Sequence, residues 1–265
     1  MNILMIGDIV GREGRDALTF WLPTYKKTYM IDLCIANAEN SAGGKGITDN
    51  IVRELQDAGV DVITLGNHAW EQRSWLDDAD RFPEVIRPWN GAPSWPGQGY
   101  YVHKGNHGKV LVINLLGQIF MQGADNPFYF MERYFQDLLD RVRPQITVVD
   151  FHAEATAEKC AMAWYLADKV AAVCGTHTHV QTADERIIGS GTAYISDLGM
   201  TGSLDGVIGM DREHSLRRFC TYLPTPYKLH SGNVHIQGAV IKVDHCCGQA
   251  RSIKRLDIKL EDIRS

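Results

Sequence analysis

The sequence predicts an α/β sandwich with antiparallel strands in its second half. Two observations predict it. Short apolar runs of β character alternate with helical patterns through the first two thirds, which is typical of buried parallel strands joined by helices. The last third instead alternates polar and apolar residues around Gly turns, which is typical of hairpins. The 265 residues contain no linker or repeat. We therefore expect one domain, residues 1–265.

The predicted elements follow from these patterns. Six apolar runs are expected as strands, at residues 2–10, 32–40, 60–68, 109–117, 146–154 and 171–179. Helical spacing covers residues 12–29, 49–59, 127–142 and 156–169. Residues 86–106 are rich in Pro, Gly, Trp and Asn and are expected as loop. Hairpin character is expected at residues 186–196 and 232–258.

Composition excludes several classes of protein. With 45% hydrophobic and 22% charged residues, the chain is expected to be globular. A net charge of −5 argues against an extended nucleic-acid surface but allows a small phosphorylated ligand. No apolar run is long enough for a membrane span, and no secretory leader is evident. The six cysteines form no C-x-x-C pair, so we expect a cytoplasmic protein without disulfides. The Cys246-Cys247 pair could bind metal or oxidise, but an incidental reduced pair is the simpler interpretation.

Polar side chains follow five of the apolar runs, at the point where each strand should end. They are Asp8, Glu39, Asn40, Asn67, His68, His152, His177 and His179. Functional sites of open α/β sheets form outside the carboxyl ends of the strands. If these strands are parallel neighbours, the eight side chains converge on one rim.

The donor types indicate a metal site. Carboxylates, amides and imidazoles without a thiolate suit Mn, Fe or Zn. Leaving His68 aside, they are too many for one catalytic zinc and enough for two ions that share a carboxylate. His177 and His179 are spaced i, i+2, so in an extended strand they would point to the same side. Each residue alone has an ordinary explanation as a helix cap, turn former or hydrogen-bonding partner. Their coincidence favours metal, and the other histidines are assigned structural or surface roles.

Motifs carry a resemblance to a known family. Four motifs resemble, in order and type, those of the calcineurin-like metallophosphoesterase superfamily. They are "GD" at residues 7–8, "GNH" at 66–68, a single His after a strand and "GTHTH" at 175–179. "GDIVGREGR", "NAENSAGGKGIT" and "GTAYISDLGMTGSLDGVIGMD" look like its YmdB-like branch, bacterial 2′,3′-cyclic-nucleotide 2′-phosphodiesterases. The resemblance extends from Met1 to about Leu223. It implies a sandwich of two packed mixed sheets flanked by helices.

The resemblance also implies roles for residues. One metal ion would be held by Asp8, Glu39, Asn40 and His179, and the other by Glu39, Asn67, His152 and His177. Glu39 would bridge the two ions, which would be iron or manganese. His68 would be catalytic, and a homo-oligomer is plausible. Three positions depart from the family pattern: Val10 replaces the usual His, Glu39 the usual Asp and Ser203 an expected Pro. Asn40 can fill the place left by Val10.

The resemblance therefore implies a hydrolase of 2′,3′-cyclic nucleotides that yields 3′-nucleotides. A metal-bridging hydroxide would attack phosphorus, and His68 would protonate the leaving oxygen. Two alternatives stay open. One is another metallohydrolase, such as a phosphomonoesterase or a 5′-nucleotidase, because the metal ligands do not select among phosphate esters. The other is a non-catalytic regulatory protein that senses a nucleotide.

Overall fold

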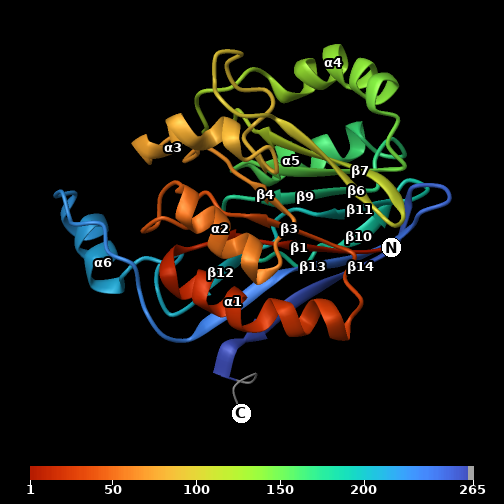
Figure 1. The fold of residues 1–265 in the computed structure, drawn as a ribbon. Coiled ribbons are helices and arrows are strands. Elements are labelled where there is room, and N and C mark those ends of the chain that lie inside the picture. Colours follow the sequence, from red (N-terminus) through yellow and green to blue (C-terminus); the bar gives the residue numbers. More distant parts are fainter. Residues whose placement is uncertain (262–265) are drawn as a thin grey trace.

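Two mixed β-sheets pack face to face, and helices cover their outer faces (Figure 1). This computed structural model describes residues 1–261, so the last four residues of the predicted domain 1–265 lie outside the described residues. The first sheet has the order β2-β12-β13-β1-β3-β4-β5, with β14 paired to β13. The second has the order β10-β11-β9-β8-β7-β6. The predicted fold class is confirmed.

The strands of the first sheet are β1 (Asn2–Ile6), β2 (Asp8–Ile9), β3 (Leu33–Asn37), β4 (Val62–Thr64), β5 (Val85–Ile86), β12 (Met200–Ser203), β13 (Val234–Asp244) and β14 (Gln249–Lys259). Those of the second are β6 (Tyr100–Gly105), β7 (Gly108–Leu116), β8 (Ile146–His152), β9 (Ala172–Thr176), β10 (Arg186–Ile188) and β11 (Thr192–Ile195). The helices are α1 (Gly11–Thr28), α2 (Asp49–Ala58), α3 (Arg73–Asp78), the 3-10 turn η1 (Ala79–Arg81), α4 (Pro127–Val142), α5 (Thr156–Tyr165) and α6 (Arg212–Thr221).

Strand direction decides where the site lies. In the first sheet β1, β3, β4 and β5 are parallel, and in the second β7, β8, β9 and β11 are parallel. The carboxyl ends of each parallel set therefore share one edge of its sheet. The hairpins expected in the last third are present as β10–β11 and β13–β14.

The core lies between the sheets and under the helices. Along β1, Ile3 and Met5 face the second sheet, whereas Leu4 and Ile6 face the layer of α1 and α2. This alternation follows from the period of two along a strand. Buried residues on the far face of the second sheet pack against α4 and α5. Each parallel strand is therefore apolar on both faces, which explains the continuous hydrophobic runs.

Helix boundaries follow local chemistry. The Asn126 side chain accepts hydrogen bonds from the backbone N–H groups of Phe128 and Tyr129, and Pro127 begins α4. Gly59 ends α2 in the left-handed conformation. Within residues 1–261, none of the helices combines the length and apolar character needed to cross a bilayer.

A prediction of local structure is wrong at the edge of the second sheet. Residues 100–105, expected as loop, form β6 as an edge strand paired antiparallel with β7. Its side chains are only partly buried or exposed, so the apolar pattern of a core strand is weak there. Pairing with the strongly apolar β7 supplies the order that the local sequence does not indicate.

Candidate metal centre

The structure brings together all eight residues that the sequence places at strand ends, but from two sheets rather than one. Asp8, Glu39 and Asn67 follow β1, β3 and β4 of the first sheet. His152 ends β8 and His177 follows β9 of the second sheet. Contacts across the rim join them, because the two facing sheets present these carboxyl ends at the same edge. The strands are therefore not all neighbours in one sheet, yet the side chains converge on one rim as expected.

The first group of donors surrounds His152. Its Nε2 lies 3.0 Å from Glu39 Oε1, 3.0 Å from Asn67 Oδ1 and 3.1 Å from His177 Nδ1. Candidate ligand atoms of Glu39, His152 and His177 all lie within 4.8 Å of one another. Four atoms with lone pairs thus face a common point, an arrangement suited to a cation.

The second group lies beside the first and includes Asp8. Asn40 Oδ1 lies 3.3 Å from His179 Nε2, and Asp8 Oδ1 lies 3.9 Å from the same nitrogen. Asp8 Oδ1 is buried without a hydrogen-bond partner, whereas Oδ2 accepts a hydrogen bond of 3.1 Å from the His177 N–H. A buried carboxylate oxygen without a partner is costly unless a cation neutralises it. The residues present therefore fit a metal ion here. Val10 is buried at the start of α1, so Asn40 supplies the donor beside His179.

Hydrogen bonds fix the ring of His152. Its Nδ1 lies 2.9 Å from Thr176 Oγ1, and that hydroxyl donates to Asp150 Oδ1 at 2.7 Å. Because the hydroxyl proton is used, Thr176 Oγ1 accepts from the Nδ1–H of His152. Nε2 is then directed at Glu39 and Asn67, where it can bind a cation once its proton has left.

The other two histidines are oriented in the same way. His177 Nε2 lies 3.1 Å from Glu154 Oε2, which leaves its Nδ1 facing His152. His179 Nδ1 lies 3.0 Å from the carbonyl oxygen of Ile208, which leaves its Nε2 facing Asn40. Each ring thus has one nitrogen bonded to an acceptor and the other directed at the donor groups of the rim, as is typical of metal-binding histidines.

The two histidines of the GTHTH motif reach the rim by a loop, not along a strand. β9 ends at Thr176, and His177 and His179 have φ angles of 107° and 64°. The expectation of an extended H-x-H is therefore wrong, because both backbones are in the left-handed region. Gly175 is required just before them, since a Cβ there would lie 1.9 Å from the Ser196 carbonyl oxygen.

A buried ion pair anchors this loop. Asp197 Oδ2 accepts hydrogen bonds from the backbone N–H of Thr178, at 3.1 Å, and from Lys159 Nζ, at 2.7 Å. Its Oδ1 accepts from the N–H of Gly199 at 2.9 Å. Lys159 and Asp197 are both almost fully buried. Since Thr178 lies between the two histidines, the pair fixes the position from which both rings extend.

We predict that Lys159→Met loosens the loop, because it leaves the Asp197 carboxylate buried without its cation. The expected loss in free energy of unfolding is about 3–5 kcal/mol, measured by urea denaturation. Metal content should fall as well. A suitable control is Lys26→Met, which removes the partly exposed pair with Asp61 and should cost no more than about 1 kcal/mol. Equal metal loss in both variants would contradict the anchoring role.

Charge in the cluster is strongly coupled. Burial lowers the pKa of His152, but the Glu39 and Asp8 carboxylates outweigh it and raise the pKa to about 9. Burial raises the pKa of Glu39, yet His152 and His68 bring it down to about 2. Burial raises the pKa of Asp8 to about 6. Burial and the neighbouring His152 lower the pKa of His177 to about 3. The buried carboxylates of the centre therefore favour a positive charge beside them, whether a proton or a metal cation.

His68 lies at the rim beside these groups. Its backbone N–H donates to Glu39 Oε2 at 2.7 Å, and its ring Nδ1 lies 3.3 Å from Glu71 Oε1. The side chain is 23% exposed, so the ring can meet a ligand from solvent. The ring thus pairs with Glu71 rather than with the donors of either group, which separates His68 from the proposed ligands.

Several groups around the site were not predicted from the sequence. These groups orient the histidines or anchor their loop through contacts that form on folding. They are Glu154, Glu71, Lys159, Asp197 and Ile208. Glu154 and Glu71 could have been found, because each lies two or three residues after a candidate histidine. The other three come from distant segments, and no local pattern marks them.

The loop of residues 41–48 contacts the segment that follows α6. Lys45 Nζ lies 5.3 Å from the centroid of the Tyr227 ring, and the Tyr227 hydroxyl donates to the Gly44 carbonyl at 3.3 Å. Ser203, another departure from the family pattern, is buried in β12 with its Oγ 2.8 Å from His230 Nδ1. Residues 203–230 therefore fold back beside the rim.

Comparison with known proteins agrees with this architecture. Residues 4–256 match the family model of the YmdB-like protein. A 2′,3′-cyclic-nucleotide 2′-phosphodiesterase of Bacillus subtilis (strain 168) is 44% identical over 256 residues, covering 97% of this chain and 96% of that protein.

Solved structures show the same fold. A hypothetical protein from Thermus thermophilus has a TM-score of 0.91 at 36% identity, covering 98% of this chain and 99% of that chain. A novel phosphatase from Mycoplasma pneumoniae has a TM-score of 0.91 at 33% identity, covering 98% and 93%. A 5′-nucleotidase from Candida albicans has a TM-score of 0.59 at 12% identity, covering 98% and 51%, which shows likeness of fold alone.

Two facing mixed sheets with an imidazole, amide and carboxylate cluster on their shared rim define a metallophosphoesterase. Within that class the chain belongs to the YmdB-like family, as its motifs predicted.

Proposed function

We propose that this chain is a dinuclear metal-dependent phosphodiesterase that hydrolyses 2′,3′-cyclic nucleotides to 3′-nucleotides. The observation that carries the proposal is the pair of adjacent donor groups, one formed by Glu39, Asn67, His152 and His177 and the other by Asp8, Asn40 and His179. The activity named for the 44% identical Bacillus subtilis protein supports the choice of substrate. The six cysteines are free thiols, which supports a reducing, cytoplasmic setting. Assembly into a homo-oligomer stays a prediction.

The proposed ligands divide into two sets. Asp8, Glu39, Asn40 and His179 would hold one ion, and Glu39, Asn67, His152 and His177 the other. We propose iron or manganese, because imidazole, amide and carboxylate donors without a thiolate suit these metals. When bound, such a pair supplies positive charge for the phosphoryl oxygens and lowers the pKa of water at the site.

His68 would complete the reaction from the rim. In the proposed hydrolysis, a water oxygen bonds to phosphorus and the phosphorus–O2′ bond breaks. The departing O2′ receives the proton from the ring of His68, the proton released by the water restores the ring through solvent, and the phosphate stays on O3′. Glu71 would hold the other ring nitrogen and so orient the donor.

Two measurements test the proposal. Elemental analysis of protein purified without a chelator or metal-binding tag should find close to two transition-metal ions per chain. Turnover should then be highest with 2′,3′-cyclic nucleotides in a panel of phosphate esters. Preference for monoesters would favour the phosphatase alternative. Tight nucleotide binding without turnover by fully metallated protein would favour the sensing alternative. If no metal binds even after incubation with Mn²⁺ or Fe²⁺, the proposed metal-dependent hydrolase is overturned.

The pKa values predict how metal affinity depends on pH. His152 carries a proton below about pH 9, and a cation must displace that proton to bind Nε2. Affinity should therefore rise about tenfold per pH unit between about pH 7 and 9 and then level off. Below about pH 6 the fall should steepen, because Asp8 also takes up a proton. Chelator competition at several pH values measures this, and constant affinity from pH 7 to 9 would contradict it.

A further inference from the structure

Two hairpin turns from different sheets meet at the end of the molecule opposite the rim. The turn between β6 and β7 carries His107, and the turn between β13 and β14 carries His245 and Cys246. The β6–β7 turn comes just before β7, which runs parallel to β8. The β13–β14 turn comes just after β13, which runs antiparallel to β1 and reaches Asn2, the first residue of β1, near its own end. Both turns therefore lie at the amino ends of the parallel strands, and the metal centre lies at the carboxyl ends.

The side chains at this junction are metal-binding types. Ligand atoms of Asp244, His245 and Cys246 lie within 4.8 Å of one another. The rings of His107 and His245 have their centroids 5.0 Å apart, so the second sheet places a further imidazole beside these three ligand atoms. An imidazole, thiolate and carboxylate set is borderline-soft, as Zn²⁺ prefers. The rim contains no thiolate, so the two sites differ in chemistry.

Neighbouring contacts orient these groups. Asp244 Oδ2 pairs with Arg251 Nη2 at 2.7 Å, and Oδ1 accepts from the Cys246 N–H at 3.0 Å, which holds the carboxylate over the turn. His107 Nε2 lies 3.3 Å from Asp32 Oδ1, which leaves its Nδ1 for another partner.

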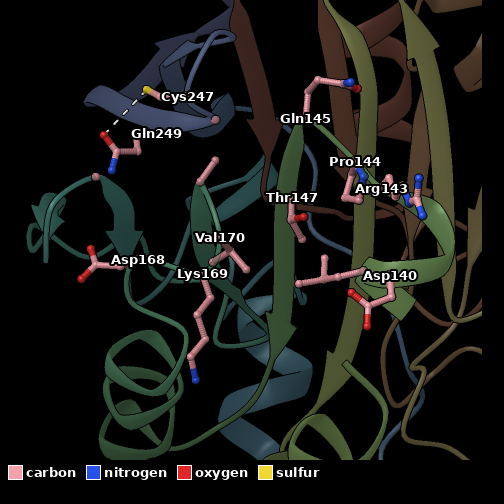
Figure 2. A pocket seen from close by; sticks show the side chains of 14 residues that line it. Asp140, Arg143, Pro144, Gln145, Thr147, Asp168, Lys169, Val170, Cys247 and Gln249 are labelled. Carbon is pink, nitrogen blue, oxygen red and sulfur yellow. Dashed lines mark hydrogen bonds between the residues drawn. The ribbon is translucent and has the colours of Figure 1, made fainter. Parts of the chain in front are cut away.

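The Sγ of Cys247 is not among the three clustered ligand atoms; it lies 3.6 Å from Arg251 Nη2 and 3.9 Å from the Asp244 carbonyl oxygen. Figure 2 shows Cys247 at a neighbouring pocket, with its Sγ directed at Gln249 Oε1, 3.7 Å away. Cys246 and Cys247 are both exposed, so burial does not distinguish them. Their contacts do, and this makes one cysteine a natural control for the other.

We propose that His107, Asp244, His245 and Cys246 form a second metal site, independent of the rim, for a borderline-soft divalent ion such as Zn²⁺. A tetrahedral ion needs Zn–N distances of about 2.0–2.1 Å and a Zn–S distance of about 2.3 Å, so these exposed side chains close slightly around it. Since the ligands come from hairpins of both sheets, the bound ion ties the sheets together at their amino ends.

Cobalt titration of the reduced full-length protein tests the site. Co²⁺ bound to a thiolate gives a near-ultraviolet charge-transfer band, which the thiolate-free rim cannot produce. The band should appear with wild-type protein, disappear on adding Zn²⁺, persist in Cys247→Ser and be absent in Cys246→Ser. His107→Ala should raise the Co²⁺ dissociation constant about tenfold or more, whereas His103→Ala on the same hairpin should not.

Three outcomes would overturn the proposal. They are no band in the wild type, a band that survives Cys246→Ser, and a band lost in Cys247→Ser. Because all variants lie on exposed turns or an edge strand, far-ultraviolet circular dichroism should confirm an unchanged fold in each. The phosphodiesterase activity does not enter this readout.

Discussion

Replacing His68 by alanine should leave two metal ions bound and lower kcat for a 2′,3′-cyclic nucleotide by about 10²–10⁴-fold. The ring lies beside Glu39 at the rim, but it pairs with Glu71 and not with the donor groups. Removing it therefore takes away a proton donor without removing a ligand. Elemental analysis and single-turnover kinetics on the same preparation measure the two quantities together.

A matched variant separates proton donation from a loss of shape. Glu71→Gln keeps the size of the side chain but removes the carboxylate that accepts from His68 Nδ1, so the ring loses the group that orients it. We expect kcat to fall, though by less than in His68→Ala, with metal content unchanged. If His68→Ala instead loses metal in proportion to activity, His68 is a ligand and its role as an acid is wrong.

The sequence could predict the rim because strand ends are local features. Asp8, Asn67 and His152 each come at the end of a largely apolar run, and such runs mark buried parallel strands. Which sheet each strand joins is a tertiary property. Strands separated by helices carry no mark of their neighbours, so the division of the rim between two sheets could not be predicted.

The conformation of the histidine loop could not be predicted for a related reason. His177 and His179 adopt left-handed backbone conformations that non-glycine residues rarely take. Contacts from Asp197 and Ile208, which are distant in sequence, impose them. The i, i+2 spacing of an extended strand therefore predicted correctly that the two side chains converge, but the backbone that brings them together is a loop and not a strand.

The same limit applied to the cysteines at the second site. Cys246-Cys247 alone is an ambiguous dipeptide. It becomes a specific hypothesis when His107, about 140 residues earlier, is placed beside His245. Contacts made by folding thus changed the interpretation from an incidental pair to one proposed ligand and one bystander.

The second large effect is expected for Glu39→Gln, which should remove both ions. The Glu39 carboxylate is buried, has its pKa lowered to about 2 and lies 3.0 Å from His152 Nε2. If it bridges, glutamine weakens both sites at once, because an amide supplies no negative charge. We expect at least about a 100-fold loss of affinity, about 2.7 kcal/mol, and no measurable turnover at stoichiometric metal.

Asp8→Asn is the control that makes this result informative. Asp8 lies next to His179 and Asn40, and it contributes only to the first proposed set. The Asp8→Asn variant should therefore lose one metal ion per chain and keep the other. Elemental analysis after gel filtration counts the ions in each variant. If Glu39→Gln also loses a single ion, Glu39 serves one metal only, and a dinuclear centre would need a different bridge at this rim.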